Sequence, residues 1–158
     1  MKDKHPSLSN VQNDAQEKML RDFERRNKGI KLEHEKVLSV GVGSTIKVDG
    51  YSKERQTVCE AWAHIGPTKP GQIHKVMQDV LKMLLLEKSL GYGLKKFYIF
   101  VDDKSTNEAS TKFSNGTSWM ATCFQEFGIK IFLAKLPKVI IDKIRKAQKD
   151  EGVRRGKK

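Results

Sequence analysis

Cysteine is scarce in this chain, which has only Cys59 and Cys123 among its 158 residues. There is no CxxC pair and no His/Cys spacing of the kind that binds structural zinc. We therefore expect neither a disulfide framework nor a zinc-dependent fold. A reducing compartment such as the cytoplasm fits this composition.

Long apolar runs are also missing. A run such as Met83–Leu86 is far shorter than the roughly 20 residues that a membrane-spanning helix needs. The first ten residues, MKDKHPSLSN, contain no apolar segment of the kind found in a secretion signal. The sequence therefore predicts no membrane partner.

Acidic residues are too few to balance the basic ones. The chain has 31 Lys and Arg against 19 Asp and Glu, which gives a formal net charge of +12. A surplus of this size favours a polyanionic partner, nucleic acid before an anionic membrane and DNA in particular. A lysine-rich surface that serves solubility alone is the alternative, since 32% of the residues are charged.

The length is that of a single domain. We place this domain at residues 10–149, between a flexible N-terminus (1–9) and a basic flexible tail (150–158). Apolar periodicity and breaker residues predict helices over residues 10–27, 70–89, 118–127 and 137–149. Strands are predicted over residues 36–42, 44–51, 56–65, 97–101 and 129–133. This order predicts an α/β (α+β) fold in which helices flank a mixed sheet.

A carboxylate interrupts the third predicted strand. Alternate residues of a strand share a face, so Glu60 points the same way as Val58 and Trp62. Burial of an unpaired carboxylate is costly, so Glu60 must be protonated, paired with a cation or bound to a metal. A purely structural ion pair with a helix lysine is one alternative.

Asp49 lies on the preceding predicted strand. If the turn is centred near Lys53, Asp49 and Glu60 are diagonal neighbours about 7 Å apart. Two carboxylates at that separation can share Mg²⁺ or Mn²⁺, which accept oxygen ligands. The alternative for Asp49 is that the Asp49-Gly50 dipeptide forms a turn.

These residues carry a family resemblance. Asp49, a hairpin and then Glu60 in a core strand, with a helix before them and a helix and strand after, resemble the PD-(D/E)XK nuclease superfamily. The resemblance covers residues 10–132 and implies a restriction-endonuclease-like α-β-β-β-α-β core. It also implies a metal ion held by Asp49 and Glu60 and Mg²⁺-dependent hydrolysis of phosphodiester bonds. The chain departs from the family pattern at Trp62, where the family has a lysine.

Some members of that superfamily supply the lysine from the following helix. In this chain the polar face of that helix offers Lys75 and Lys82. The helix should bring Lys82 close to Glu60, whereas Lys75 lies nearer the open end of the strand, from which its long side chain can reach the site. Our first choice is Lys75, followed by Lys82 and Asp79.

Other polar residues near the predicted site have supporting roles. His64 shares the face of Glu60 and could carry a proton near neutral pH, although a histidine without a partner at a strand end usually serves structure. We group it with further residues expected to support the site or contact nucleic acid, namely Lys69, Gln72, Gln78 and Asp79.

Two other functions remain open from the sequence. The absence of a lysine at position 62 also fits a nucleic-acid-binding module on the same fold that has lost catalysis. A flavodoxin-like domain for a small ligand or protein partner would use Asp102 or Asp103 at the end of a strand, although these residues could simply cap a helix. Trp119 is expected in the core, although a base could stack on it if it were exposed. A nuclease this small could act as a homodimer.

Overall fold

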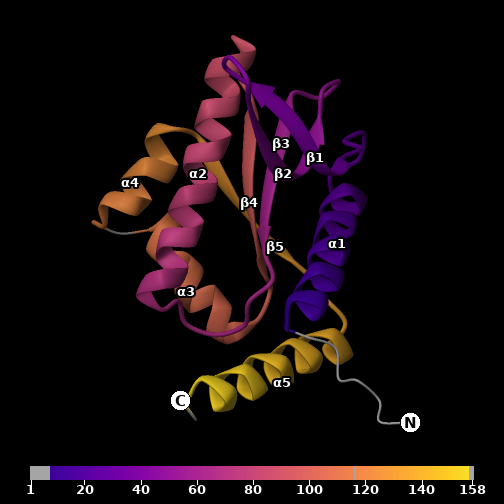
Figure 1. Cartoon of the computed structure of the whole chain (residues 1–158), viewed down its shortest axis with the longest axis vertical. Coiled ribbons are helices and arrows are strands. Elements are labelled where there is room, and N and C mark those ends of the chain that lie inside the picture. Colours follow the sequence, from indigo (N-terminus) through magenta and orange to yellow (C-terminus); the bar gives the residue numbers. More distant parts are fainter. Residues whose placement is uncertain (1–7, 116, 157–158) are drawn as a thin grey trace.

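A five-stranded sheet lies between two layers of helices in the computed structural model, which describes residues 8–115 and 117–156 (Figure 1). The helices are α1 (Leu8–Arg26), α2 (Pro70–Leu90), α3 (Lys104–Ser114), α4 (Trp119–Glu126) and α5 (Lys138–Arg155). The strands are β1 (Glu33–Val40), β2 (Ser44–Ser52), β3 (Thr57–Trp62), β4 (Lys95–Val101) and β5 (Ile129–Ala134).

The strands follow one another across the sheet in the order β1-β2-β3-β4-β5. The first three form an antiparallel meander, whereas β3, β4 and β5 run parallel to one another. The predicted mixed sheet flanked by helices is therefore confirmed. The fold is not flavodoxin-like, because that fold requires a parallel sheet with the strand order 2-1-3-4-5.

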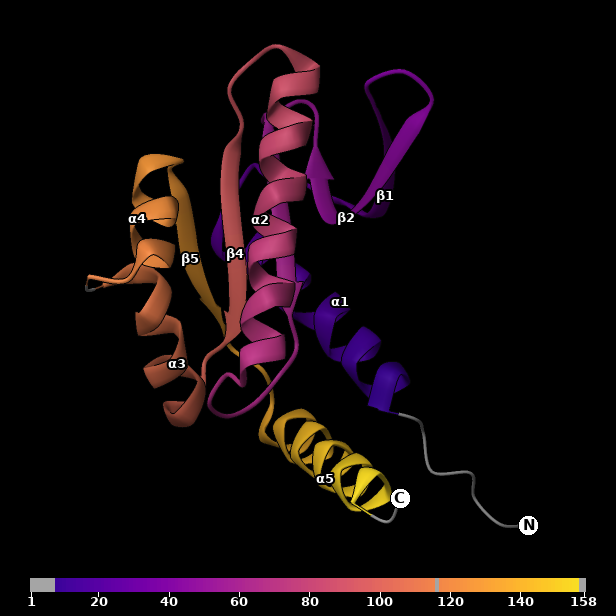
Figure 2. The ribbon, with the colours of Figure 1, turned by 60° about the vertical axis from the view of Figure 1, so that its left-hand side comes forward.

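Each face of the sheet has its own hydrophobic core. α2, α3 and α4 cover one face, where Val80, Met83 and Phe113 pack against Tyr98 and other sheet residues. Residues of α1 and α5 form the core on the other face, and Figure 2 shows α5 below the sheet. Because β3 is covered on both sides, all six of its residues are buried. The chain therefore places Glu60 where water has little access.

Helix α3 was not predicted from the sequence. Its residues, KSTNEASTKFS, are mostly polar, and its buried face is formed by Thr106 and Ser110 together with Phe113, so few apolar residues mark it as a helix. The helix begins after Asp103, whose carboxylate accepts a hydrogen bond from the backbone N–H of Ser105 and forms an ion pair with Arg145. Asp102 accepts from the side chain of Asn107. The cap interpretation of this acidic pair is therefore confirmed.

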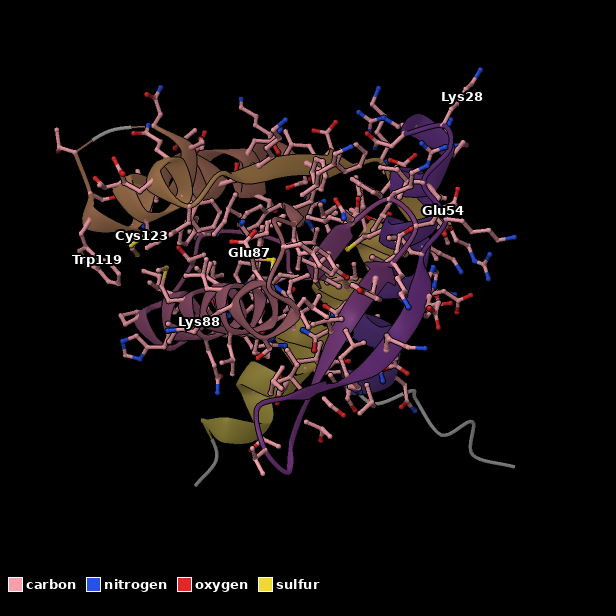
Figure 3. The ribbon with its side chains drawn as sticks, turned by 90° about the horizontal axis from the view of Figure 1, so that it is seen from above. Lys28, Glu54, Glu87, Lys88, Trp119 and Cys123 are labelled. Atoms are coloured by element: carbon pink, nitrogen blue, oxygen red, sulfur yellow. The ribbon has the colours of Figure 1, made fainter. Side chains whose placement is uncertain are left out.

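Two further expectations need correction. Trp119 is not in the core, because it is the first residue of α4 and 64% of it is exposed; Figure 3 shows it at the periphery of the molecule. Helix α5 continues to Arg155 and takes in part of the segment predicted as a tail. Residues 1–7 of the predicted N-terminal segment and residues 157–158 of the tail lie outside the described residues.

Among the residues described, no helix combines the length and apolar character needed to cross a membrane.

Gly50 allows α1 to pack closely on the sheet next to Asp49. A Cβ atom at this position would lie 2.9 Å from Cδ1 of Leu32 and 3.2 Å from Cδ2 of Leu20. Both contacts are too short for carbon atoms, so an added methyl group must displace these side chains or the helix. The glycine of the Asp49-Gly50 dipeptide therefore serves close packing, and the turn expected for it is absent because both residues lie within β2.

We expect Gly50→Ala to destabilise the protein by about 1–3 kcal/mol, the usual cost of overpacking a core. Urea denaturation measures this difference. Gly71→Ala is the matched control, because a Cβ there meets nothing within 4 Å. Equal stability of the two variants would show that α1 does not depend on Gly50.

Candidate functional site

The register of β2 and β3 brings Asp49 and Glu60 together. The pairs Ser52 with Thr57 and Gly50 with Cys59 enclose a turn over residues 53–56. The turn is centred between Glu54 and Arg55 and not on Lys53, and the ladder ends at the Gly50–Cys59 pair, one residue short of Asp49 and Glu60. The two carboxyl groups are close enough for a hydrogen bond between them to influence the pKa of Glu60.

Asp49 is held between two strands and a helix. Its Oδ2 accepts a hydrogen bond of 2.8 Å from the backbone N–H of Ala61 on β3 and another of 2.8 Å from Nε2 of Gln16 on α1. The same Gln16 nitrogen donates to the carbonyl oxygen of Ala61 at 2.6 Å. The carboxylate oxygen of Asp49 and the carbonyl oxygen of Ala61 therefore both accept from one nitrogen atom, Nε2 of Gln16.

Glu60 is the buried carboxyl group of the site, with 1% of its surface exposed. Its Oε1 lies 2.7 Å from Nζ of Lys82, an ionic contact without hydrogen-bond angles. Within the described residues this oxygen accepts no hydrogen bond. Burial, and then the neighbouring Asp49 and Asp79 carboxylates, raise the pKa of Glu60 to about 9, although Lys82 acts in the opposite direction. The single ammonium group of Lys82 therefore does not offset the burial of Glu60 and the two carboxylates beside it.

Lys82 reaches Glu60 from α2. Its ammonium group is 2.7 Å from Glu60 Oε1, 3.1 Å from Asp79 Oδ1 and 3.2 Å from the backbone oxygen of Lys47. Burial by itself lowers the pKa of Lys82, but the Glu60 and Asp79 carboxylates more than offset this and raise it. Lys82 is therefore a charged group, and it contacts oxygen atoms from three different residues.

Lys75, the first choice from the sequence, lies elsewhere. Its Nζ donates to Oδ2 of Asp79 at 2.8 Å, and half of its side chain is exposed. Lys82 and not Lys75 is the helix lysine in contact with Glu60. The reason is the path of α2 across β3, which brings Lys82 over the middle of the strand, next to Glu60. Lys75 lies two helical turns earlier and contacts Asp79.

His64 is placed for structure and not for proton transfer. Its ring stacks on that of Trp62 with 4.6 Å between ring centroids, and the Gln72 amide nitrogen lies 3.3 Å from Nε2. Burial and then the charge of Lys69 lower the pKa of His64 to about 4, so the ring is neutral near pH 7. The stacking on Trp62 and the lowered pKa favour the structural role that a histidine at a strand end usually has.

The remaining predicted residues, Lys69, Gln72 and Gln78, lie at the N-cap of α2 or on the helix itself. The side-chain oxygen of Gln72 accepts from the backbone N–H of Lys69 at 2.8 Å, which caps the helix. Gln78 is exposed on the outer surface of α2. Among the described residues, no hydrogen bond or ion pair joins Lys69, Gln72 or Gln78 to Asp49 or Glu60. Only Asp79 of this supporting group belongs to the site.

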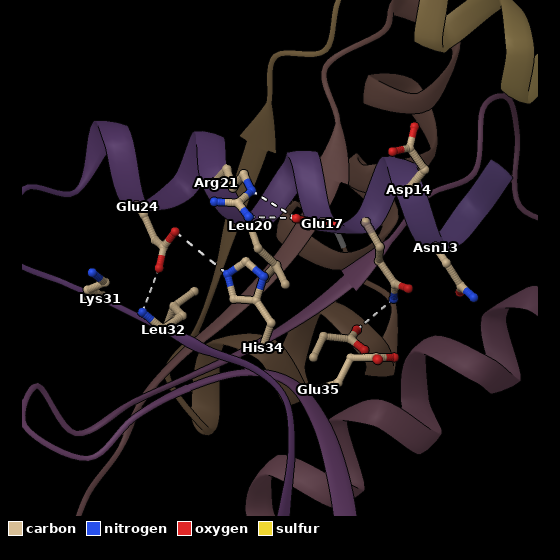
Figure 4. A pocket seen from close by; sticks show the side chains of 12 residues that line it. Asn13, Asp14, Glu17, Leu20, Arg21, Glu24, Lys31, Leu32, His34 and Glu35 are labelled. Atoms are coloured by element: carbon tan, nitrogen blue, oxygen red, sulfur yellow. Dashed lines mark hydrogen bonds and ion pairs between the residues drawn. The ribbon is translucent and has the colours of Figure 1, made fainter. Parts of the chain in front are cut away.

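A pocket of about 660 Å³ between α1 and the β1–β2 hairpin opens onto Asp49 (Figure 4). Gln16 also lines it, together with acidic residues that have partners of their own. Figure 4 shows Glu17 paired with Arg21, and Glu24 in contact with His34 and with the backbone of Leu32. The pocket gives solvent and small ions a path to Asp49.

The oxygen atoms of this site fit a hard divalent cation. In the part of the chain that the structure describes, no cluster of three or more His, Cys, Asp or Glu side chains could hold a metal. Asp49 and Glu60 offer two carboxylates, and the carbonyl of Ala61 lies beside Asp49. Mg²⁺ is typically bound through one or two carboxylates and keeps several waters, so this donor set suits it.

Two site residues were missed from the sequence. Tyr98 had a usable signal, because it is the only polar side chain in the run FYIFV and its hydroxyl donates to Asp79 Oδ2 at 3.0 Å. Gln16 had none, because it is one of many polar residues on an amphipathic helix. Its contact with Asp49 spans 33 positions of the chain and depends on how α1 docks.

Comparison of the chain with models of protein families, with curated proteins and with solved structures found no match. The resemblance seen in the sequence is therefore not tested by any relative. The function of this chain must be argued from the residues of its own site.

The raised pKa of Glu60 makes a prediction about stability. Between about pH 4.5 and about pH 9, folded Glu60 keeps a proton that the unfolded chain releases. Raising the pH through this range therefore favours the unfolded state, and the free energy of unfolding should fall. Urea denaturation in EDTA across the range measures the slope, and the isosteric variant Glu60→Gln should show a smaller fall. Parallel curves for the two proteins would contradict the buried, protonated state.

Proposed function

We propose that this chain is a Mg²⁺- or Mn²⁺-dependent nuclease of the PD-(D/E)XK type that hydrolyses phosphodiester bonds of nucleic acid, with DNA as its favoured substrate. One observation carries the proposal. Asp49 and Glu60 meet across β2 and β3, and Lys82 from the next helix contacts Glu60. Two carboxyl groups that could bind a divalent cation therefore lie beside the positive charge of Lys82.

The order of elements supports the same assignment. α1, the β1-β2-β3 meander, α2 and β4 follow one another as the α-β-β-β-α-β core of that superfamily does. Asp49 lies on the second strand and Glu60 on the third. Both acidic residues therefore occupy the elements that the resemblance implies.

Asp49 and Glu60 would hold the metal ion, beside the carbonyl oxygen of Ala61. When bound, the ion lowers the pKa of a water molecule and offsets charge on the phosphate. Glu60 must give up its proton to become a ligand. A bound cation would supply the additional positive charge that stabilises the ionised carboxylate. The Gln16 amide, which bridges Asp49 and Ala61, must move aside or turn its oxygen toward the ion.

Lys82 takes the part of the family lysine that is missing at position 62. Trp62 is 7% exposed and its ring packs on those of His64 and Phe100, so it cannot reach a phosphate. The ammonium group of Lys82 is charged, and 29% of its side chain is exposed next to Glu60. It is placed to donate a hydrogen bond to the attacking water or to a phosphate oxygen as negative charge develops there.

We expect the purified protein to nick or degrade plasmid DNA in the presence of Mg²⁺ or Mn²⁺. Asp49→Asn and Glu60→Gln should abolish cleavage, and Lys82→Met should lower kcat by about 100-fold, the usual loss for one transition-state donor. Lys88→Met is the matched control, because Lys88 is an exposed lysine of the same helix and should leave kcat unchanged. Circular dichroism establishes that each variant is folded, and equal activity of Lys82→Met and Lys88→Met would refute the role of Lys82.

A second function is a nucleic-acid-binding module without catalysis. It is favoured by the fact that Lys82 already contacts three oxygen atoms, from Glu60, Asp79 and Lys47, which would compete with a substrate for its ammonium group. The net charge of +12 serves both functions.

Binding of a labelled DNA duplex should weaken steeply as salt rises, because phosphate contacts release counterions. Fluorescence anisotropy at a series of salt concentrations gives the slope. Salt-sensitive binding without cleavage by any divalent cation supports the second function over the first. If neither binding nor cleavage occurs, both functions fail and the basic residues serve solubility.

A further inference from the structure

Asp79 is a second buried carboxylate, and both of its oxygen atoms are in use. It is 2% exposed and lies between α2 and β4. Its Oδ1 contacts Lys82 at 3.1 Å, while Oδ2 accepts from Lys75 at 2.8 Å and from the hydroxyl of Tyr98 at 3.0 Å. A buried carboxylate is costly unless it is paired in this way, so its three contacts explain why it is tolerated there.

The contact between Asp79 and Lys82 limits where the lysine can point. A lysine side chain has several rotatable bonds and loses up to about 2 kcal/mol of conformational entropy when it is held in place. Lys82 is only partly buried, so packing alone does not hold its ammonium group. Asp79 lies three positions earlier on the same helix and contacts the same ammonium group that contacts Glu60.

Tyr98 fixes Asp79 in turn. It pairs with Glu60 in the register of β3 and β4, so both side chains point toward α2. Its ring is fully buried in an apolar strand, where a phenylalanine would fill the same volume. The hydroxyl donates to Asp79 and not to Glu60, which leaves Glu60 Oε1 for Lys82.

Lys75 neutralises Asp79 from the solvent side. The site contains three carboxyl groups, Asp49, Glu60 and Asp79, and two ammonium groups, Lys75 and Lys82. Without Lys75, Asp79 would compete with Glu60 for the charge of Lys82. The spacing of Lys75, Asp79 and Lys82 along α2 places the three on one side of the helix.

We propose that Asp79 is a positioning residue that holds the ammonium group of Lys82 against Glu60, and that the Tyr98 hydroxyl fixes Asp79 for this task. The assignment of a catalytic consequence rests on the proposed nuclease function. The positioning itself concerns only residues of this chain and can be measured without substrate.

The variants Asp79→Asn and Tyr98→Phe test the proposal, because each removes one interaction and keeps the volume of the side chain. Tyr98→Phe is the milder change and leaves Asp79 charged, so it remains informative if Asp79→Asn folds poorly. The matched controls are Asp142→Asn, an exposed aspartate on α5, and Tyr92→Phe, whose hydroxyl contacts that of Tyr51.

The first measurement is the order of the lysine side chains by ¹⁵N NMR relaxation of the full chain without substrate. We expect the Lys82 ammonium to be ordered in the wild type and in both controls, and mobile in Asp79→Asn, with a smaller loss of order in Tyr98→Phe. Unchanged order of Lys82 in both variants would overturn the proposal, whether or not the protein is a nuclease.

The second measurement is the kinetics of cleavage of a fluorescein-labelled DNA duplex with Mg²⁺. Asp79→Asn should lower kcat about 10- to 100-fold with KM unchanged, as expected for a residue that orients a catalytic group. In a Lys82→Met background the same substitution should have no further effect, since there is no ammonium left to position. A rise in KM alone, or an equal loss in the Lys82→Met background, would overturn the catalytic role. If the wild type does not cleave DNA, the proposed function fails and the relaxation data still decide the positioning.

Discussion

Burial of the Glu60 carboxyl group is the constraint on which the rest of the site depends. Helices cover both faces of β3, so a carboxylate at its centre has lost its water. Burial and the nearby Asp49 raise the pKa of Glu60, and Lys82 offsets part of this cost. Asp79 then holds Lys82, and groups from α2 and β4 hold Asp79. Each polar contact of this network therefore stabilises a charged or polar group that the fold has buried.

The two helix layers contribute different groups to the site. α2 brings Lys82 and Asp79 to the face that Glu60 occupies. α1 brings Gln16 to Asp49, in the wall of a pocket that opens to solvent. The carboxyl pair thus has fixed positive charge on one side and a path for water and small ions on the other. This division of roles suits a site in which a divalent cation and a phosphate group must meet.

Much of the fold could be predicted because hydrophobic periodicity is a local signal. The strands, the long helix that begins at Pro70 and the mixed sheet are all present, with boundaries a few residues from those expected. Helix α3 escaped prediction because small polar residues, Thr106 and Ser110, take apolar positions on its buried face, although Asp103 at its start is a good cap. Trp119 was misplaced for a related reason. Residue type favours burial of tryptophan, but only the docking of α4 decides which of its sides faces solvent.

The sequence by itself determined that a carboxylate lies in a core strand, that another precedes it across a hairpin, and that position 62 holds no lysine. Tertiary structure alone decided which partners they have. Lys75 and Lys82 are equivalent as residues on one polar helix face, and the angle at which α2 crosses β3 selects Lys82. The docking of α1 likewise selects Gln16. The physical reason is that periodicity along a chain specifies faces, whereas a contact of 2.7 Å depends on how separate elements pack against each other.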